Sequence, residues 1–183
     1  FPDTKIFSSI EQSFDFDFSG YTIATPVSTH FKLAKKIINQ GYSVLIEKPM
    51  TLNSLEAEKI LELSKVKKVN VMVGHVLLFH PAIQKMKQLI DDGKIGELQY
   101  IYSNRLNLGQ VRSEENVFWS FAPHDISILQ YFTDSNPIEI NTVGGAFLQK
   151  NIYDTTLTTL SYPNNIKAHI YLSWLHPLKS IAL

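Results

Sequence analysis

Short apolar runs alternate with segments of helical periodicity over residues 20–74. The runs YTIAT (21–25), YSVLI (42–46) and NVMVG (70–74) are rich in apolar and β-branched residues, which predicts three buried strands. The segments between them place apolar residues on one helical face. Because strand, helix and strand follow one another through short loops, the pattern predicts parallel strands with right-handed crossovers, part of a doubly wound α/β sheet.

The predicted helices carry N-terminal signals. Ser28 or Thr29 is a plausible N-cap for the first helix, and Asn53, with a glutamate three residues later, opens the second as a capping box. His80 stands in an N-cap place directly before Pro81, and proline is well suited to the first helical position. This last signal predicts a helix that begins a new part of the chain.

Beyond residue 80 the pattern is α+β rather than α/β. It predicts a long strand, a helix and then consecutive strands with tight turns, which favours an antiparallel meander. In order, these segments are 96–109, 120–132, 138–148, 155–162 and 167–174, with a PNN turn at 163–165. Gly144 and Gly145 lie inside one predicted strand, where we expect a bulge.

Composition adds mainly exclusions. The 183 residues are 44% hydrophobic and 19% charged, with a formal net charge of +0, so no global field attracts nucleic acid or an anionic membrane. With no cysteine, a disulfide scaffold and a thiolate metal site are both excluded. No apolar run has the roughly 18 residues of a membrane span, and the first ten residues do not resemble a signal peptide. We therefore expect a cytoplasmic protein.

The triplet Glu47-Lys48-Pro49 ends the second predicted strand. In open α/β sheets, ligands bind at the carboxyl ends of the strands. A lysine there can hold a substrate hydroxyl and lower its pKa, with Glu47 to orient it and Pro49 to fix the backbone. The alternative is a surface Lys–Glu pair, which contributes almost nothing to stability.

The segment ATPVSTH (24–30) links a strand end to a helix start. Its small and hydroxyl side chains leave backbone amides and Oγ atoms available to a ligand. Ordinary N-capping of the helix explains the same residues.

His124 and Asp125 lie next to each other at what the pattern predicts to be a helix start. Histidine is the usual general base near neutral pH. A capping aspartate beside a half-buried histidine is the alternative. No metal site is expected, since no second histidine or cysteine stands at ligand spacing.

The only two arginines of the chain, Arg105 and Arg112, lie in one asparagine-rich stretch. A guanidinium matches the geometry of a phosphate or carboxylate, and Asn107 has an amide suited to a sugar hydroxyl. A loop with local ion pairs to Glu114 and Glu115 remains the alternative.

Four strings in order carry a resemblance to a known family. IATPVSTH, VLIEKPMTL and VMVGHVLLFHPAIQKMKQLIDDGKIGELQYI resemble the Gfo/Idh/MocA family of NAD(P)-dependent sugar oxidoreductases. YSNRLNLGQVRSEENVFWSFAPHDISIL is similar to the subgroup that acts on UDP-N-acetyl-sugars, which includes UDP-N-acetylglucosamine and UDP-N-acetylglucosaminuronate 3-dehydrogenases. The resemblance covers nearly the whole chain.

The resemblance implies a fold and an assembly. Residues 1–76 would be the C-terminal part of a Rossmann domain that binds NAD or NADP. Residues 77–183 would be a substrate-binding α+β domain with an open, mostly antiparallel sheet, truncated at its C-terminus. One face of that sheet usually meets a neighbouring subunit in this family, so we expect a homo-oligomer, either a dimer or a tetramer.

The resemblance also implies residue roles. Lys48 would be the catalytic lysine, and His124 would take the hydroxyl proton as hydride leaves the sugar carbon for nicotinamide. The positions expected to bind the cofactor are Thr25, Pro26, His30, Glu47, Lys48 and Pro49. On chemical grounds we expect Arg105, Asn107 and Arg112 on the substrate side, against a diphosphate or uronate. The implied substrate is a nucleotide sugar oxidised at C3, a UDP-N-acetyl-hexosamine or its uronate.

Two features depart from the family pattern. Several branches place an aspartate four residues before the histidine, where this chain has Ser120, so a proton relay through aspartate is not expected. No G-x-G-x-x-G occurs in the 183 residues. We therefore expect a fragment that begins partway through the Rossmann domain and by itself binds NAD poorly. A related enzyme acting on a free sugar or inositol, and a non-catalytic binding or assembly fragment, remain alternatives.

Overall fold

The computed structural model describes residues 4–109, 111–113 and 115–183. The chain forms two compact units, Phe1–Gly74 and His75–Leu183. Each unit has its own hydrophobic core, around Ile37, Ile38 and Ile46 in the first unit and Leu129, Ile170 and Leu172 in the second. No helix of the described residues is long and apolar enough to cross a membrane.

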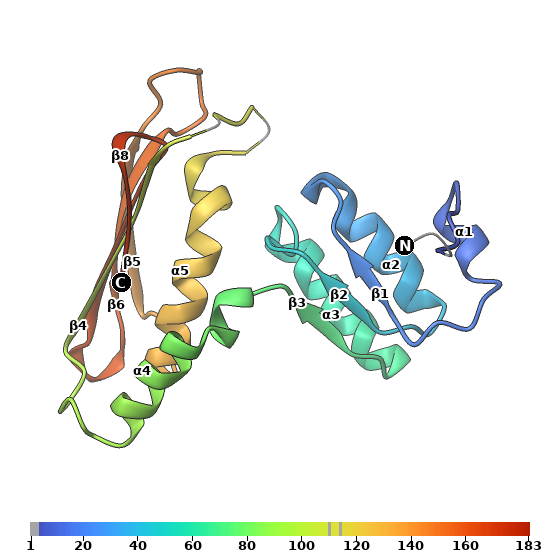
Figure 1. Cartoon of the computed structure of the whole chain (residues 1–183), viewed down its shortest axis with the longest axis horizontal. Coiled ribbons are helices and arrows are strands. Elements are labelled where there is room, and N and C mark those ends of the chain that lie inside the picture. Colours follow the sequence, from blue (N-terminus) through green and yellow to red (C-terminus); the bar gives the residue numbers. More distant parts are fainter. Residues whose placement is uncertain (1–3, 110, 114) are drawn as a thin grey trace. The chain divides into compact units, whose positions relative to one another are not determined.

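The first unit is a three-stranded parallel sheet covered by helices (Figure 1). Its elements are α1 (Ile10–Ser13), β1 (Tyr21–Ile23), η1 (Val27–Thr29), α2 (His30–Asn39), β2 (Val44–Ile46), α3 (Ser54–Lys67) and β3 (Val71–Val73). The strand order is β1-β2-β3, and α2 packs on β1, β2 and α3. The predicted parallel strands with helical crossovers are confirmed.

The two cap predictions for this unit have different outcomes. Asn53 caps α3 as predicted, because its side chain accepts a hydrogen bond from the amide of Leu55 at 2.8 Å. Thr29 is the N-cap residue of α2, as one of the two predicted candidates, but its side chain makes no capping hydrogen bond. The short helix η1 leads directly into α2, and the Thr29 hydroxyl donates instead to the carbonyl of Pro26 at 2.7 Å.

The second unit is a five-stranded mixed sheet with α4 and α5 on one of its faces (Figure 1). Its elements are η2 (Val76–Phe79), α4 (Pro81–Asp91), β4 (Tyr100–Leu108), α5 (Val117–Thr133), β5 (Glu139–Gly145), β6 (Thr155–Ser161), η3 (Pro163–Asn165), β7 (Lys167–Ser173) and β8 (Leu175–Ala182). The strand order is β5-β6-β7-β4-β8, and the pairing is antiparallel except between β4 and β7. The predicted fold class is confirmed.

The helix α5 begins earlier than predicted. Asn116 is its N-cap and accepts a hydrogen bond from the amide of Trp119 at 3.1 Å. His124 and Asp125 therefore lie in the middle of a 17-residue helix that contains Pro123, and not at a helix start. The alternative in which Asp125 acts as a cap is wrong.

The predicted bulge at Gly144 and Gly145 is also wrong. These residues pair with Thr156 and Thr155 in unbroken register. A Cβ atom on Gly144 would lie 2.7 Å from the carbonyl oxygen of Thr155, and one on Gly145 would collide with the ring of Phe147. The glycines are needed for this close approach.

A buried carboxylate holds the connection that follows β5. Asp154 is fully buried, and it accepts hydrogen bonds from the indole nitrogen of Trp174 at 2.6 Å and from the amides of Phe147 and Leu148 at 2.6 and 2.9 Å. Burial acts to raise the pKa of Asp154, but the three hydrogen bonds outweigh it and hold that pKa below its usual range. The segment between β5 and β6 is thereby fixed to the core.

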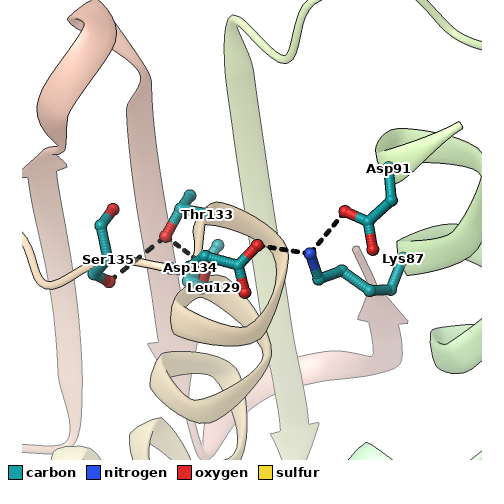
Figure 2. Close-up of polar contacts among 6 residues, drawn as sticks. All are labelled: Lys87, Asp91, Leu129, Thr133, Asp134 and Ser135. Carbon is teal, nitrogen blue, oxygen red and sulfur yellow. Dashed lines mark hydrogen bonds and ion pairs between the residues drawn. The ribbon is translucent and has the colours of Figure 1, made fainter. Parts of the chain in front are cut away.

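A lysine between two aspartates joins α4 to the end of α5 (Figure 2). The side chain of Lys87 is 10% exposed, and its ammonium lies 2.5 Å from a carboxylate oxygen of Asp91 and 2.5 Å from one of Asp134. Burial acts to lower the pKa of Lys87, but the hydrogen bonds to Asp134 and Asp91 outweigh it, so the pKa is raised. The charged form therefore stabilises the folded unit.

We expect Asp134→Asn to lower the free energy of unfolding at pH 7 by roughly 0.5–1 kcal/mol, because the carboxylate is largely exposed and screened by solvent. Asparagine tolerates the left-handed backbone at this position, so the change removes the charge alone. A raised lysine pKa adds stability that is complete below the ordinary value of 10.5 and is lost as the pH rises through the folded value. The difference between variant and parent should therefore vanish at strongly alkaline pH.

Urea denaturation from pH 7 to pH 11 measures this difference. Glu97→Gln removes an exposed negative charge from the same unit and is the matched control. If Asp134→Asn and the control lower the free energy of unfolding equally at pH 7, the stabilising role of the contacts of Lys87 with Asp91 and Asp134 is contradicted.

Candidate functional site

The carboxyl ends of the three parallel strands lie side by side at one edge of the first unit. The amide of Glu47 donates to the carbonyl of Ile23 at 2.9 Å, and the amide of Gly74 donates to the carbonyl of Ile46 at 2.8 Å. These bonds continue the strand pairing one residue beyond β2 and β3. The edge therefore presents the Glu-Lys-Pro turn beside the end of β3, with the exposed Thr25 just after the end of β1.

The side chain of Glu47 folds over the end of β3. A Cβ atom on Gly74 would lie only 3.1 Å from a carboxylate oxygen of Glu47, so a glycine lets the carboxylate approach this closely. The same carboxylate accepts a hydrogen bond from the amide of Lys48 at 3.3 Å. Lys48 is half-buried, and a cis peptide bond joins it to the buried Pro49. Glu47 thus holds the backbone from which the lysine side chain extends.

His30 ties two loops of this edge together. It is 1% exposed, and its ring nitrogens lie 2.8 Å from the carbonyl oxygen of Thr25 and 3.0 Å from that of Pro49. Carbonyl oxygens only accept hydrogen bonds, so a neutral ring satisfies one of them and an imidazolium satisfies both. In this structure His30 links the backbone of the predicted cofactor residues Thr25 and Pro49. A direct role toward the cofactor stays a prediction, as it does for the exposed Pro26.

In the second unit, His124 is half-buried on α5, and its carbonyl accepts a hydrogen bond from the hydroxyl of Ser127 at 2.8 Å. The next residue, Asp125, is 1% exposed and meets β4. Arg105 donates two hydrogen bonds to the carboxylate of Asp125, from Nε to Oδ2 at 3.0 Å and from Nη2 to Oδ1 at 2.9 Å. The hydroxyl of Ser103 adds a third bond, to Oδ1 at 2.7 Å. The guanidinium of Arg105 thus has a carboxylate partner within its own unit.

The other predicted substrate residues lie nearer the surface. The side chain of Arg112 is 58% exposed, and its Nη1 lies 3.1 Å from Oε1 of Glu115. The hydroxyl of Ser120 donates to the same carboxylate oxygen at 2.7 Å. The ion pair to Glu115 expected under the alternative reading is therefore present, whereas Glu114 lies outside the described residues. Asn107 is half-buried on β4.

Sequence reasoning missed Ser103 and the partner role of Asp125. A signal for both existed in the strand pattern. Residues two apart on a strand project from the same face, so Ser103 and Arg105 form a polar pair on the side of β4 that α5 covers. A buried serine and arginine on one face predict a buried acidic partner.

Two family models match the chain. Residues 3–75 match the model described as "Oxidoreductase family, NAD-binding Rossmann fold", and residues 83–182 match the model described as "GFO/IDH/MocA C-terminal domain". The second match alone covers more than half of the chain. The chain therefore belongs to the Gfo/Idh/MocA oxidoreductase family.

Curated relatives and solved structures agree with this assignment. The chain is 32% identical over 126 residues to UDP-N-acetylglucosamine 3-dehydrogenase of Acidithiobacillus ferrooxidans, covering 68% of this chain and 39% of that protein. It is 30% identical over 128 residues to scyllo-inositol 2-dehydrogenase (NAD(+)) of Bacillus subtilis, covering 67% of this chain and 36% of that protein. A structure of the Acidithiobacillus enzyme superposes with a TM-score of 0.86 at 26% identity, covering 97% of this chain and 57% of that one. The chain thus spans less than half the length of these curated relatives.

The polar groups at the edge of the first unit are of the types that can bind the nicotinamide side of NAD. The carboxylate of Glu47 lies against Gly74 at the ends of β2 and β3. Further polar groups at this edge are the hydroxyls of Thr25 and Thr29, which lie 2.6 Å apart, and the half-buried Lys48. These groups suit an amide and ribose hydroxyls. The pattern G-x-G-x-x-G does not occur in residues 1–183, so the fit concerns this side of the cofactor alone.

We expect His30→Leu to lower the free energy of unfolding by about 1–3 kcal/mol, because the buried imidazole no longer bonds the carbonyls of Thr25 and Pro49, of which the second lies in a buried contact. His30→Gln keeps a donor and should lose less. Urea denaturation of both variants, with the exposed Lys32→Leu on the same helix as control, measures the effect. Equal stability of His30→Leu and the control would show that the bridge does not hold the edge.

Proposed function

We propose that these residues belong to an oxidoreductase that uses NAD, or NADP, to oxidise a sugar hydroxyl, at C3 of a UDP-N-acetyl-hexosamine or its uronate. The observation that carries the proposal is the Glu47-Lys48 turn, held against Gly74 at the carboxyl edge of a parallel sheet in a chain of this family. The 32% identity to a UDP-N-acetylglucosamine 3-dehydrogenase supports the substrate class.

Lys48 and His124 have separate roles in the proposed reaction. The ammonium of Lys48 holds the oxygen of the reacting alcohol and lowers the pKa of its hydroxyl. The imidazole of His124 takes the hydroxyl proton as general base. NAD, when bound, supplies the acceptor for the hydride that leaves the carbon. A ketone forms, and the proton released from the hydroxyl stays on His124 until solvent removes it.

Arg112 is proposed to contact the diphosphate or the uronate carboxylate. Its guanidinium is more than half exposed and shares Glu115 with Ser120, so nitrogen atoms of the fork remain able to bind an anion. Asn107 is proposed to bind a sugar hydroxyl through its amide. Arg105 was also expected to bind the substrate. Its guanidinium is paired with Asp125 and its side chain is 15% exposed, so only a small part of it is accessible to a ligand.

A polyol dehydrogenase is the second candidate function. It is favoured by the 30% identity to the scyllo-inositol enzyme. A neutral polyol gives an exposed guanidinium no anion to bind, so dependence on Arg112 separates the two candidates.

The uncovered face of the five-stranded sheet is proposed as a contact between copies of the chain. Tyr100, Tyr102, Val143 and Leu157 are 54%, 46%, 68% and 41% exposed. The two tyrosines also pack on His169 of β7. An exposed apolar and aromatic sheet face of this kind marks an interaction surface, and a second copy of the same face is its simplest partner.

In the complete protein that contains these residues, we expect Lys48→Met to lower kcat by about 10²–10⁴-fold, because the fixed positive charge beside the alcohol oxygen is lost. NADH binding should stay near the parent value. Spectrophotometry at the NADH absorbance with UDP-N-acetylglucosamine, its uronate and scyllo-inositol measures turnover, and exposed Lys65→Met is the control. Unchanged turnover in Lys48→Met would end the assignment of Lys48, and turnover of inositol alone would select the second candidate.

We expect Leu157→Lys to reduce the molar mass measured by light scattering after size-exclusion chromatography, since it places a charge in the apolar sheet face. Val66→Lys changes an equally apolar but exposed residue of α3 and is the matched control. A parent and a Leu157→Lys variant that share one molar mass would contradict an interface on this face.

A further inference from the structure

The backbone around His124 contains a break in the helical hydrogen bonding. Pro123 lies inside α5, directly before His124. Proline has no amide hydrogen, so α5 lacks the bond that residue 123 would otherwise donate to the carbonyl four residues earlier. The ring also pushes on that preceding turn. The helix is therefore least constrained by its own backbone at the turn that leads into the proposed general base.

A fixed point follows immediately after this break. Asp125 accepts three hydrogen bonds at 2.7–3.0 Å from Ser103 and Arg105, both on β4. The Arg105 fork is bidentate, which fixes the carboxylate in direction as well as in distance. Because consecutive helical residues point about 100° apart, anchoring Asp125 on the sheet sets the direction of the His124 side chain.

We propose that Arg105, with Ser103, is a positioning residue that acts on His124 through Asp125. The inference rests on the proposed function of His124 as general base. In this proposal Arg105 does not bind the substrate directly; it positions His124 instead. The ion pair compensates the break at Pro123 and holds the imidazole at the place and angle that proton transfer needs. Arg112 is then the one arginine of the two that is left for an anionic substrate group.

Lysine cannot replace the arginine fork. A lysine at position 105 keeps the charge that neutralises Asp125 but gives one point contact in place of two parallel bonds. We expect Arg105→Lys, in the complete protein, to stay folded and to lower kcat about 100-fold, with KM for the nucleotide sugar changed less than about threefold. Ser103→Ala removes one bond and keeps the ion pair, so its loss of kcat should be smaller.

Steady-state kinetics of these two variants and of Arg112→Lys test the assignment. Arg112→Lys should instead raise KM for a UDP-sugar, because its proposed contact is with the substrate. The pH–rate profile of Arg105→Lys should be displaced along the pH axis, since His124 meets altered surroundings. A raised KM with unchanged kcat in Arg105→Lys would show that Arg105 binds substrate. Unchanged kcat and KM would show that it only stabilises the fold. Either result overturns the proposal.

A measurement without turnover separates this inference from the proposed function. Histidine-selective ¹⁵N NMR resolves the imidazoles, and His124→Gln assigns the signal of His124. In Arg105→Lys that signal should move, while the signal of the exposed His80 keeps its shift. If it stays in place the positioning role is wrong, whatever the enzyme oxidises. If it moves although no UDP-sugar is turned over, the coupling stands and the proposed substrate fails.

Discussion

Parallel pairing of β1, β2 and β3 is the constraint on which the candidate site of the first unit depends. Parallel strands end at the same edge, so residues far apart in sequence become neighbours there. The bond from the Glu47 amide to Ile23 and the bond from the Gly74 amide to Ile46 carry the pairing just past the strands. His30 then joins the loop after β1 to the turn after β2. A polar turn beside a glycine is thereby fixed in place.

In the second unit, buried carboxylates fix segments that are far apart in the sequence against one another. Asp125 joins α5 to β4 beside the proposed general base, and Asp154 holds the connection from β5 to the core around Trp174. Each has its lone pairs satisfied by several donors, which is the condition under which a buried charge is tolerated. Both are single points where a loop or a helix is fixed against the sheet.

Much of the fold was predictable from local signals. Asn53 before α3 and His80-Pro81 before α4 are cap patterns whose meaning does not depend on the rest of the chain, and both act as N-caps in the structure. The alternation of strand and helix over residues 20–74 likewise follows from local hydrophobic period. The position of Lys48 at a strand end came from the same reading.

What could not be predicted depends on contacts across the sequence. The ion pair of Arg105 and Asp125 joins residues 20 apart, and although the pattern of β4 indicates that Ser103 and Arg105 need an acidic partner, it does not indicate which residue supplies it. The start of α5 at Val117 was hidden because Pro123 resembles a helix beginning. Gly144 resembles a bulge in sequence, while its reason is the close approach of the Thr155 carbonyl.

Transfer of isotope tests the central claim most directly. The complete protein would be given NAD⁺ and UDP-N-acetylglucosamine carrying deuterium at C3 of the sugar, and the mass of the reduced cofactor would be measured. The account predicts that NADH gains one deuterium and that the reaction slows relative to the unlabelled sugar. Reduced cofactor without deuterium, or no reduction with any sugar or polyol tested, would contradict it.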